Sequence, residues 1–187
     1  MAGKTALVFL AEGAEEMETV IVVDVLRRAK IAVTLASLTD NLTVECSRQV
    51  KMVADCPLAH VKDQLFDAVV LPGGAKGRDN LCNSSEVGDI LKKHEEQGKI
   101  VAAVCASSTV FLKFDIGKGK SVTSYPAFRS ELENDYKYSE DRVVVDGNLV
   151  SSRGPGTSFE FAFKLAELLV DKEMADQLKS QTLALTA

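Results

Sequence analysis

The sequence contains little histidine and no paired cysteine motif, and these two absences narrow its chemistry. Only two histidines, His60 and His94, occur in 187 residues, and neither stands at a metal-ligand spacing from a cysteine. None of the four cysteines belongs to a C-x-x-C pair: Cys46, Cys56, Cys82 and Cys105. Because zinc sites and thioredoxin-like motifs need such spacings, we predict free thiols, no bound metal and a reducing intracellular compartment.

Long apolar runs and clusters of basic charge are absent as well. The apolar stretch near the amino terminus has only about six residues before Glu12 and further acids follow, which is too short for a signal peptide. We therefore expect neither secretion nor membrane insertion. The 22 basic residues are scattered among 27 acidic ones, and the formal charge is −5. This balance argues against a dedicated nucleic-acid footprint.

The length and composition predict one domain spanning residues 1–187. Hydrophobic residues make up 46% of the chain, so a full core can form without disulfides or metal. No internal repeat, low-complexity tract or Pro- or Ser-rich linker marks a boundary within the sequence.

Short apolar runs alternate with segments of helical periodicity. We predict four strands: Thr5–Leu10, Ile31–Leu38, Asp67–Leu71 and Ile100–Val104. The helices are expected at about these positions: Glu15–Lys30, Val87–Gln97, Ala106–Phe114 and Phe159–Val170. A hairpin on an Asp146-Gly147 turn is expected within Arg142–Ser152. This alternation indicates an α/β fold with a mostly parallel sheet covered by helices on both faces.

Three loops follow the carboxyl ends of predicted strands, where open α/β sheets bind ligands. They carry in turn the acids of residues 12–18, the Pro72-Gly73-Gly74 turn, and the Cys105-Ala106-Ser107 segment. If these strands are neighbours, a carboxyl, backbone N–H groups and a thiol converge in one pocket. A thiolate attacks carbonyls or is oxidised, the amides of the glycines and Ala106 hold an oxyanion, and a carboxyl moves a proton.

Cys105 is the predicted nucleophile, because it ends an apolar strand and precedes small residues that can open a helix, whose unpaired N–H groups favour a thiolate. A cysteine in this position can equally be a small buried hydrophobe. Periodicity does not choose among Glu15, Glu16 and Glu18, and a solvated first-turn charge is the default for each. Core or surface positions without a role are expected for the remaining thiols and histidines: Cys46, Cys56, Cys82, and, on solvated surface, His60 and His94.

Four segments carry a family resemblance: Glu15–Val20, Leu71–Gly74, Val104–Ala106 and Ser152–Phe161. Together they resemble the ThiJ/PfpI superfamily, and within it the parkinsonism-associated redox-sensor and deglycase branch. The similarity extends from Ala6 to about Lys179, with the acidic loop and the Arg-Gly-Pro-Gly segment specific to that branch. The resemblance implies a flavodoxin-like sandwich, a homodimer and chemistry that needs no cofactor.

The same resemblance implies roles for individual residues. Cys105 would be both the nucleophile and the oxidation-sensitive thiol. Glu18 would be a protonated acid that hydrogen-bonds the cysteine, lowers its pKa and stabilises its sulfinate form. The oxyanion amides would come from Gly73, Gly74 and Ala106, and Arg48 would lie near the pocket at the dimer interface.

Two departures from the family pattern stand near the predicted site. Similar members carry a histidine where this chain has Tyr125, within Ser124-Tyr125-Pro126, and they commonly read Ala-Gly-Pro where this chain has Ala106-Ser107-Ser108. The absent histidine removes a base, since tyrosine is a poor one near neutral pH. These differences leave thiol oxidation intact as an expectation and bear mainly on turnover of a carbonyl substrate.

Two functions of different classes follow from the resemblance. One is a cytoprotective response to oxidative stress, in which Cys105 is oxidised to the sulfinate. The other is a glyoxalase or deglycase that acts on small 2-oxoaldehydes, such as methylglyoxal and glyoxal, or on glycated proteins. A cysteine protease is disfavoured, because no His-Asp pair is placed to activate the thiol. The expected location is the cytoplasm, with movement to the nucleus or mitochondrion implied only by the resemblance.

Overall fold

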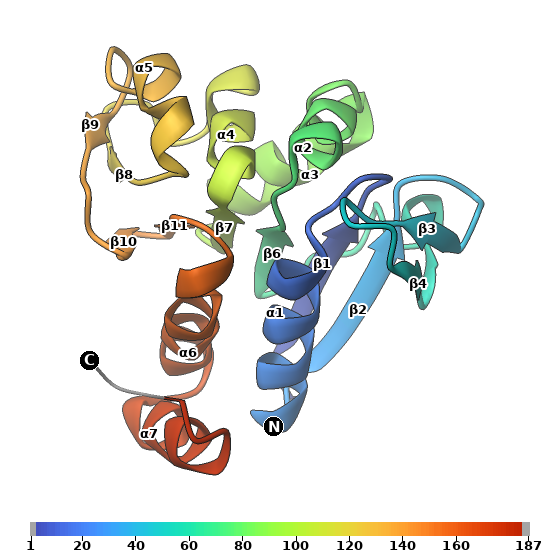
Figure 1. Cartoon of the computed structure of the whole chain (residues 1–187), viewed down its shortest axis with the longest axis vertical. Coiled ribbons are helices and arrows are strands. Elements are labelled where there is room, and N and C mark those ends of the chain that lie inside the picture. Colours follow the sequence, from blue (N-terminus) through green and yellow to red (C-terminus); the bar gives the residue numbers. More distant parts are fainter. Residues whose placement is uncertain (1–2, 185–187) are drawn as a thin grey trace.

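A seven-stranded sheet forms the centre of the computed structural model, which describes residues 3–184 (Figure 1). Its strands are β1 (Thr5–Leu10), β2 (Ala32–Ser37), β5 (Cys56–Pro57), β6 (Ala68–Leu71), β7 (Ile100–Val104), β10 (Val143–Asp146) and β11 (Leu149–Ser152). Their order is β10-β11-β7-β6-β1-β2-β5. All neighbours are parallel except β10 and β11, which form an antiparallel hairpin at one edge.

Two small sheets lie outside the central one. One is the antiparallel pair β3 (Thr43–Glu45) and β4 (Lys51–Val53), and the other is the parallel pair β8 (Ser121–Val122) and β9 (Lys137–Tyr138). In Figure 1 these two pairs lie on opposite sides of the molecule.

Helices lie on both faces of the central sheet. They are α1 (Glu16–Arg28), α2 (Ala75–Cys82), α3 (Ser85–Glu96), α4 (Thr109–Lys113), α5 (Arg129–Leu132), α6 (Ser158–Leu169) and α7 (Lys172–Gln181). Short 3-10 turns occupy Leu58–His60, Cys105–Ser108, Pro126–Phe128 and Pro155–Thr157. Helices α1 and α6 lie side by side and α7 packs against α6, as Figure 1 shows. No helix within residues 3–184 is long and apolar enough to cross a membrane.

Strand β1 shows why a continuous apolar run was to be expected. Successive side chains of a strand point to opposite faces, so a strand covered on both sides must be apolar throughout. Ala6, Val8 and Leu10 belong to the core shared with α1 and α6, whereas Leu7 and Phe9 belong to the core shared with α3 and α4. All five are fully buried. The predicted α/β fold, with a mostly parallel sheet covered on both faces, is therefore confirmed.

The segment after β7 differs from the sequence prediction. A helix was expected over Ala106–Phe114, but a 3-10 turn at Cys105–Ser108 precedes α4, which has only five residues. Cys105 itself has φ 62°, outside the helical region. The amide of Ala106, at the start of this 3-10 turn, lowers the pKa of the thiol as expected, but the segment that it opens is a short turn and not the long helix that was predicted.

Other differences have local causes. The α2 and α7 helices were not predicted, because few of their residues are apolar: only Gly77 and Leu81 of α2, and Ala175 and Leu178 of α7, are buried. The hairpin turns at residues 147–148, one position later than expected, since Asp146 still pairs with Leu149. The remaining predicted strands and helices are present, with ends that differ by at most two residues.

Candidate active site

Cys105 lies at the carboxyl end of β7 in a strained backbone conformation. Its φ of 62° falls in the left-handed region, which costs a non-glycine residue roughly 1–3 kcal/mol and persists only where neighbouring contacts impose it. The Tyr125 N–H donates a hydrogen bond to the Cys105 carbonyl at 3.3 Å, and the Thr109 hydroxyl donates one to the carbonyl of Ala106 at 2.8 Å. These contacts hold the turn that presents the half-buried thiol.

Glu18 lies in the first turn of α1 with no exposed surface. The Gly73 N–H donates a hydrogen bond to its Oε2 at 2.7 Å. Its other oxygen, Oε1, is buried and has no hydrogen-bond partner of normal geometry among the described residues. The Cys105 side chain is close enough to affect the protonation of this carboxyl. The structure therefore brings Glu18 and Cys105 together, as the family resemblance implied, because they follow β1 and β7, which are separated in the sheet only by β6.

The start of α1 is fixed to the loop after β6. Glu15 caps the helix, since its Oε2 accepts a hydrogen bond from the Glu18 N–H at 2.8 Å. The Glu15 N–H in turn donates to the Gly73 carbonyl at 2.9 Å. Gly73 is thus bonded through both its N–H and its carbonyl to the first turn of α1, which sets the position of the Glu18 carboxyl.

Two glycines allow this close approach. A Cβ on Gly73 would lie 2.5 Å from Glu18 Oε2 and 2.7 Å from the Cβ of Cys105. A Cβ on Gly74, which has φ 90°, would collide with the carbonyl oxygen of Gly13. The backbone of this loop can lie so close to Glu18, Cys105 and Gly13 only because residues 73 and 74 have no side chains.

Burial raises the pKa of Glu18 from 4.5 to about 7. The Gly73 hydrogen bond opposes this rise because it favours the carboxylate, and repulsion from Glu15 adds to it. A carboxyl of this kind is partly protonated at neutral pH. The neutral acid that the family resemblance implied for Glu18 agrees with this direction.

Burial also raises the pKa of the Cys105 thiol to about 12, and the charge on Glu18 contributes to the rise. The backbone amides of Ala106 and Gly74 act in the opposite direction, because an N–H group near the sulfur favours the thiolate and lowers the pKa. The direction is opposite to the lowering that the resemblance implied for this thiol. Because an ionised Glu18 repels a thiolate, the thiolate forms most readily once Glu18 holds a proton, and the two groups titrate as a pair.

Two other expected site residues have different surroundings. The Gly73 N–H donates to Glu18, so the oxyanion-binding role expected for it does not fit, and Gly74 and Ala106 are left as the donors that face the sulfur. Arg48 is exposed, and its guanidinium donates to the Ser47 carbonyl at 3.2 Å. No contact between Arg48 and Cys105 occurs within the described part of the chain.

Glu16 is not the solvated first-turn charge that the sequence suggested. It is buried, and its carboxylate accepts hydrogen bonds from the Ser47 hydroxyl and the Arg48 N–H, both at 2.8 Å. Burial opposes ionisation, but hydrogen bonds from its own backbone, Ser47 and Arg48 prevail and lower its pKa. Glu16 thus fastens the turn between β3 and β4 to α1. Glu15, the helix cap, is buried too.

His94 also departs from expectation, since it is fully buried rather than solvated. Its Nε2 accepts a hydrogen bond from the Phe66 N–H at 3.0 Å and its Nδ1 lies 2.7 Å from the Ile90 carbonyl. Burial lowers its pKa. His94 therefore serves as a neutral structural bridge, and His60 is exposed as predicted.

The other thiols also have raised pKa values, and none of them has the left-handed backbone of Cys105. All four cysteines are free, and burial raises the pKa of Cys46 to about 11 and also raises that of Cys56 and Cys82. No group of three or more His, Cys, Asp or Glu side chains within residues 3–184 is arranged to hold a metal ion.

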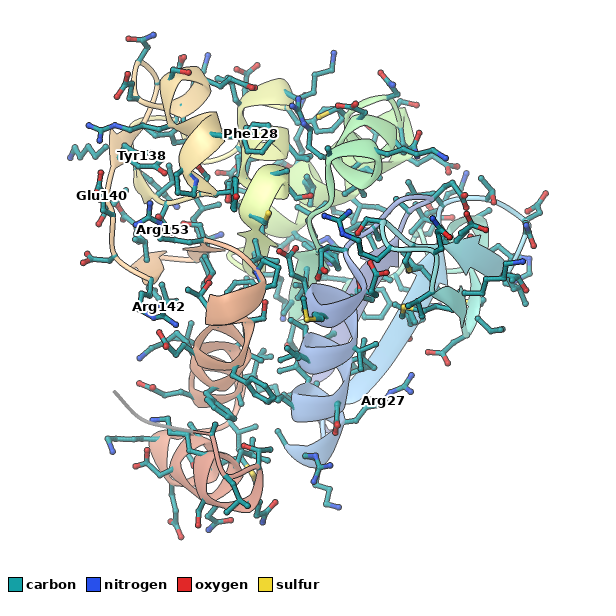
Figure 2. The ribbon with its side chains drawn as sticks, in the orientation of Figure 1. Arg27, Phe128, Tyr138, Glu140, Arg142 and Arg153 are labelled. Atoms are coloured by element: carbon teal, nitrogen blue, oxygen red, sulfur yellow. The ribbon has the colours of Figure 1, made fainter. Side chains whose placement is uncertain are left out.

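The Arg-Gly-Pro-Gly segment lies beside the loop that carries Tyr125. A Cβ on Gly154 would lie 3.5 Å from the Tyr125 ring. Arg153 Nη1 donates to the backbone carbonyl of Glu140 at 2.9 Å, and both residues are labelled on the left of Figure 2. The ring of Tyr125 is 47% exposed. The residue that replaces the family histidine is therefore adjacent to the site through its backbone, while its side chain faces solvent.

Ser107 is a site residue that sequence reasoning missed. Its hydroxyl is fully buried and donates a 2.6 Å hydrogen bond to the carbonyl of Pro72. The two residues are 35 positions apart, and no local pattern signals their contact. The only available signal was the departure from the Ala-Gly-Pro pattern that follows the cysteine in similar sequences.

Fold and site together define a class: a flavodoxin-like α/β protein with a strained cysteine at a strand end beside a buried carboxyl. The family model described as the DJ-1/PfpI family matches residues 4–168. The chain belongs to this family, which confirms the ThiJ/PfpI resemblance.

Three curated relatives match nearly their full length. Protein dj-1beta of Drosophila melanogaster is 51% identical over 176 residues, which cover 94% of each chain. The Parkinson disease protein 7 homolog of Danio rerio is 50% identical over 184 residues, covering 96% of this chain and 97% of the relative. The glutathione-independent glyoxalase DJR-1.2 of Caenorhabditis elegans is 35% identical over 178 residues, covering 95% of each.

Solved structures agree with the fold. The crystal structure of Drosophila melanogaster DJ-1beta superposes with a TM-score of 0.97 at 49% identity, covering 99% of this chain and 100% of that one. The oxidized form of Toxoplasma gondii DJ-1 superposes with a TM-score of 0.92 at 36% identity, covering 97% and 98%.

Proposed function

We propose that this protein is a cytoprotective, oxidative-stress-responsive protein in which Cys105 is oxidised to the sulfinate. The observation that carries the proposal is the buried Glu18 carboxyl beside the half-buried Cys105 thiol. The solved structure of an oxidized relative with the same fold supports it. A buried acid with a pKa of about 7 can both accept and return a proton near neutral pH.

Activation begins with transfer of the thiol proton to Glu18. The transfer leaves the total charge of the pair unchanged and avoids the repulsion that a carboxylate and a thiolate would exert on each other. The amides of Ala106 and Gly74 donate to the resulting sulfur anion. The negative charge thus moves from the Glu18 carboxylate, which accepts a hydrogen bond from Gly73, to the Cys105 sulfur, which the amides of Ala106 and Gly74 stabilise.

Oxidation then takes place in two balanced steps. The thiolate attacks one oxygen of hydrogen peroxide, forms a sulfur–oxygen bond and breaks the O–O bond, and the proton held by Glu18 passes to the departing hydroxide, which gives a sulfenic acid and water. A second peroxide adds a second oxygen in the same way and gives water and a sulfinic acid, whose proton passes to the Glu18 carboxylate and leaves the sulfinate. Glu18 in its neutral form then donates a charge-assisted hydrogen bond to a sulfinate oxygen.

The proposal is tested by limiting peroxide titration, followed by peptide mass spectrometry of all four cysteines. We expect selective gain of two oxygens at Cys105 in the wild type and weaker, less selective gain in Glu18→Gln. Cys82→Ser is the matched control, since it removes a half-buried thiol away from Glu18. Equal oxidation of all four cysteines in the wild type would refute the proposal.

A second candidate function is a cofactor-independent glyoxalase or deglycase. The similarity to a relative named a glutathione-independent glyoxalase supports it, as do the amides of Gly74 and Ala106 beside the thiol. The Cys105 thiolate would add to the aldehyde carbon of methylglyoxal, and an amide would donate to the oxyanion that forms. A deglycase would act on the early adducts that such aldehydes form on proteins, in which the carbon open to attack by the thiolate is similar.

Glu18 would then carry the proton between carbons. Removal of the proton from the former aldehyde carbon and its return to the adjacent carbon convert the adduct into a thioester of a 2-hydroxy acid. Water cleaves the thioester, which regenerates the thiol and releases lactate. The sum is methylglyoxal plus water giving lactate, with no external oxidant or reductant.

Formation of lactate from methylglyoxal tests this second function. Turnover should be lost in Cys105→Ala and in Glu18→Gln, and should remain in Cys82→Ser. Activity retained by Cys105→Ala would refute the glyoxalase function. The redox function would not be affected by that result, because the peroxide titration tests it separately.

We also propose a homodimer built on the exposed face of α1. Met17 and Val20 stand one turn apart on this helix, and 54% and 49% of their surfaces are exposed. The same helix binds the turn that carries Arg48 through Glu16. Pairing of α1 faces would bury these apolar side chains and bring Arg48 near the dimer interface.

For location, we propose the cytoplasm, with movement to the nucleus and mitochondrion under oxidative stress. Free cysteines at all four positions support a reducing compartment. Fractionation of cells before and after peroxide treatment tests this proposal, and recovery of the protein from the secreted fraction alone would contradict it.

A further inference from the structure

The loop that carries Cys105 is tied to the Pro72-Gly73-Gly74 loop by one buried side chain. The Ser107 hydroxyl donates to the Pro72 carbonyl at 2.6 Å, and both residues are buried. Within residues 3–184 this hydroxyl is the only donor to that carbonyl. Loss of the bond would leave a buried acceptor without a partner, which costs more than the bond itself contributes.

The tied loop is the one that surrounds the thiol. Pro72 is followed by Gly73, whose N–H positions Glu18 and whose backbone comes close to the Cβ of Cys105. Gly74 comes next, and its amide, like that of Ala106, favours the ionised form of the thiol and lowers its pKa. One of these two donors thus belongs to each loop, so their separation depends on how the loops are held together.

We propose that Ser107 is a positioning residue, which ties the two loops so that the Gly74 and Ala106 amides point at the Cys105 sulfur together. This inference rests on the proposed function, in which Cys105 reacts as a thiolate. The tie needs a side-chain hydroxyl at this position, which glycine or alanine would lack.

The chain contains a matched control at the next residue. Ser108 is also fully buried, but its hydroxyl has no hydrogen-bond partner among the described residues. Ser107→Ala and Ser108→Ala remove the same atom from adjacent buried positions. Only the first removes the tie between the loops.

The experiment measures the rate of Cys105 alkylation by iodoacetamide as a function of pH, followed by peptide mass spectrometry. No carbonyl substrate or peroxide is present. In Ser107→Ala we expect the rate at neutral pH to fall about tenfold and the rise of the rate with pH to begin about one unit higher, because the sulfur loses an aligned donor. Ser108→Ala should keep the wild-type profile.

The alternatives are separated by the same data. Ser107→Gly removes the hydroxyl without adding an atom, so the result does not depend on one variant folding. Wild-type profiles in both Ser107 variants would overturn the inference, even if thermal unfolding showed a loss of stability. Equal shifts in the Ser107 and Ser108 variants would overturn it as well. A wild-type Cys105 that reacts no faster than the other thiols would overturn the proposed function and this inference with it.

Discussion

The Gly73 N–H donates a 2.7 Å hydrogen bond to Glu18 Oε2 across 55 residues of sequence. This contact joins the loop after β6 to the first turn of α1 and leaves the second carboxyl oxygen, Oε1, buried without a conventional partner. One oxygen of this carboxyl is thus fixed by the backbone, and the other is left without a hydrogen bond. Its orientation therefore depends on the path of the glycine backbone.

Gly73→Ala should destabilise the protein and disrupt the site together. The added Cβ would lie 2.5 Å from Glu18 Oε2 and 2.7 Å from the Cβ of Cys105, so the backbone or the carboxyl must move. We expect a loss of about 1–3 kcal/mol in the free energy of unfolding by urea denaturation. Gly156→Ala is the control, because a Cβ there meets nothing within 4 Å. An equal effect of both variants would contradict the steric explanation.

The raised pKa of Glu18 predicts a specific pH dependence of stability. Folding raises this pKa from 4.5 to about 7, so between these values the folded state holds a proton that the unfolded state has released. The free energy of unfolding should therefore fall as pH rises through this window, by about 3 kcal/mol in all. Glu18→Gln cannot titrate, so its stability relative to the wild type should increase with pH.

Urea denaturation of wild type and Glu18→Gln at several pH values from about 4.5 to 8 measures this difference. Glu45→Gln provides a control at an exposed acid. If the difference in free energy of unfolding between the wild type and Glu18→Gln stays constant across this pH range, the pKa of Glu18 is not raised in the folded state.

Dimerisation through α1 can be tested with a charge on its exposed face. Met17→Glu should convert the dimer into a monomer in light-scattering measurements, because an exposed apolar contact would become a repulsive pair across a two-fold interface. Leu168→Glu alters a comparably exposed residue of α6 and should leave the mass unchanged. Loss of the dimer in the Leu168 variant alone would show that the interface does not lie on α1.

Helix α6 offers a prediction about the core. Phe161 is fully buried against the sheet, whereas Phe159, two residues earlier, is 41% exposed. Phe161→Ala should lower the free energy of unfolding by about 3–5 kcal/mol, since it leaves a cavity in a packed core. Phe159→Ala should cost clearly less. Chemical denaturation measures both, and equal costs would contradict the assignment of the two faces.

The sequence determined the elements whose pattern is set by burial. A strand covered on both faces must be apolar throughout, so β1 and β7 begin and end at the predicted residues. Helices α1, α3 and α6 show apolar residues at helical spacing for the same reason. The loops that follow β1, β6 and β7 could also be predicted to converge, because parallel neighbours end at one edge of a sheet.

Tertiary structure decided which residues of those loops form the site and in which state. No local pattern separated Glu18 from Glu15 and Glu16, and the resemblance alone selected it; the structure shows three different surroundings, a thiol, a helix cap and a β-turn. The left-handed backbone of Cys105 and the bond from Ser107 to Pro72 likewise arise between segments far apart in sequence. Burial and long-range hydrogen bonds set protonation, and both depend on neighbours that only the folded chain supplies.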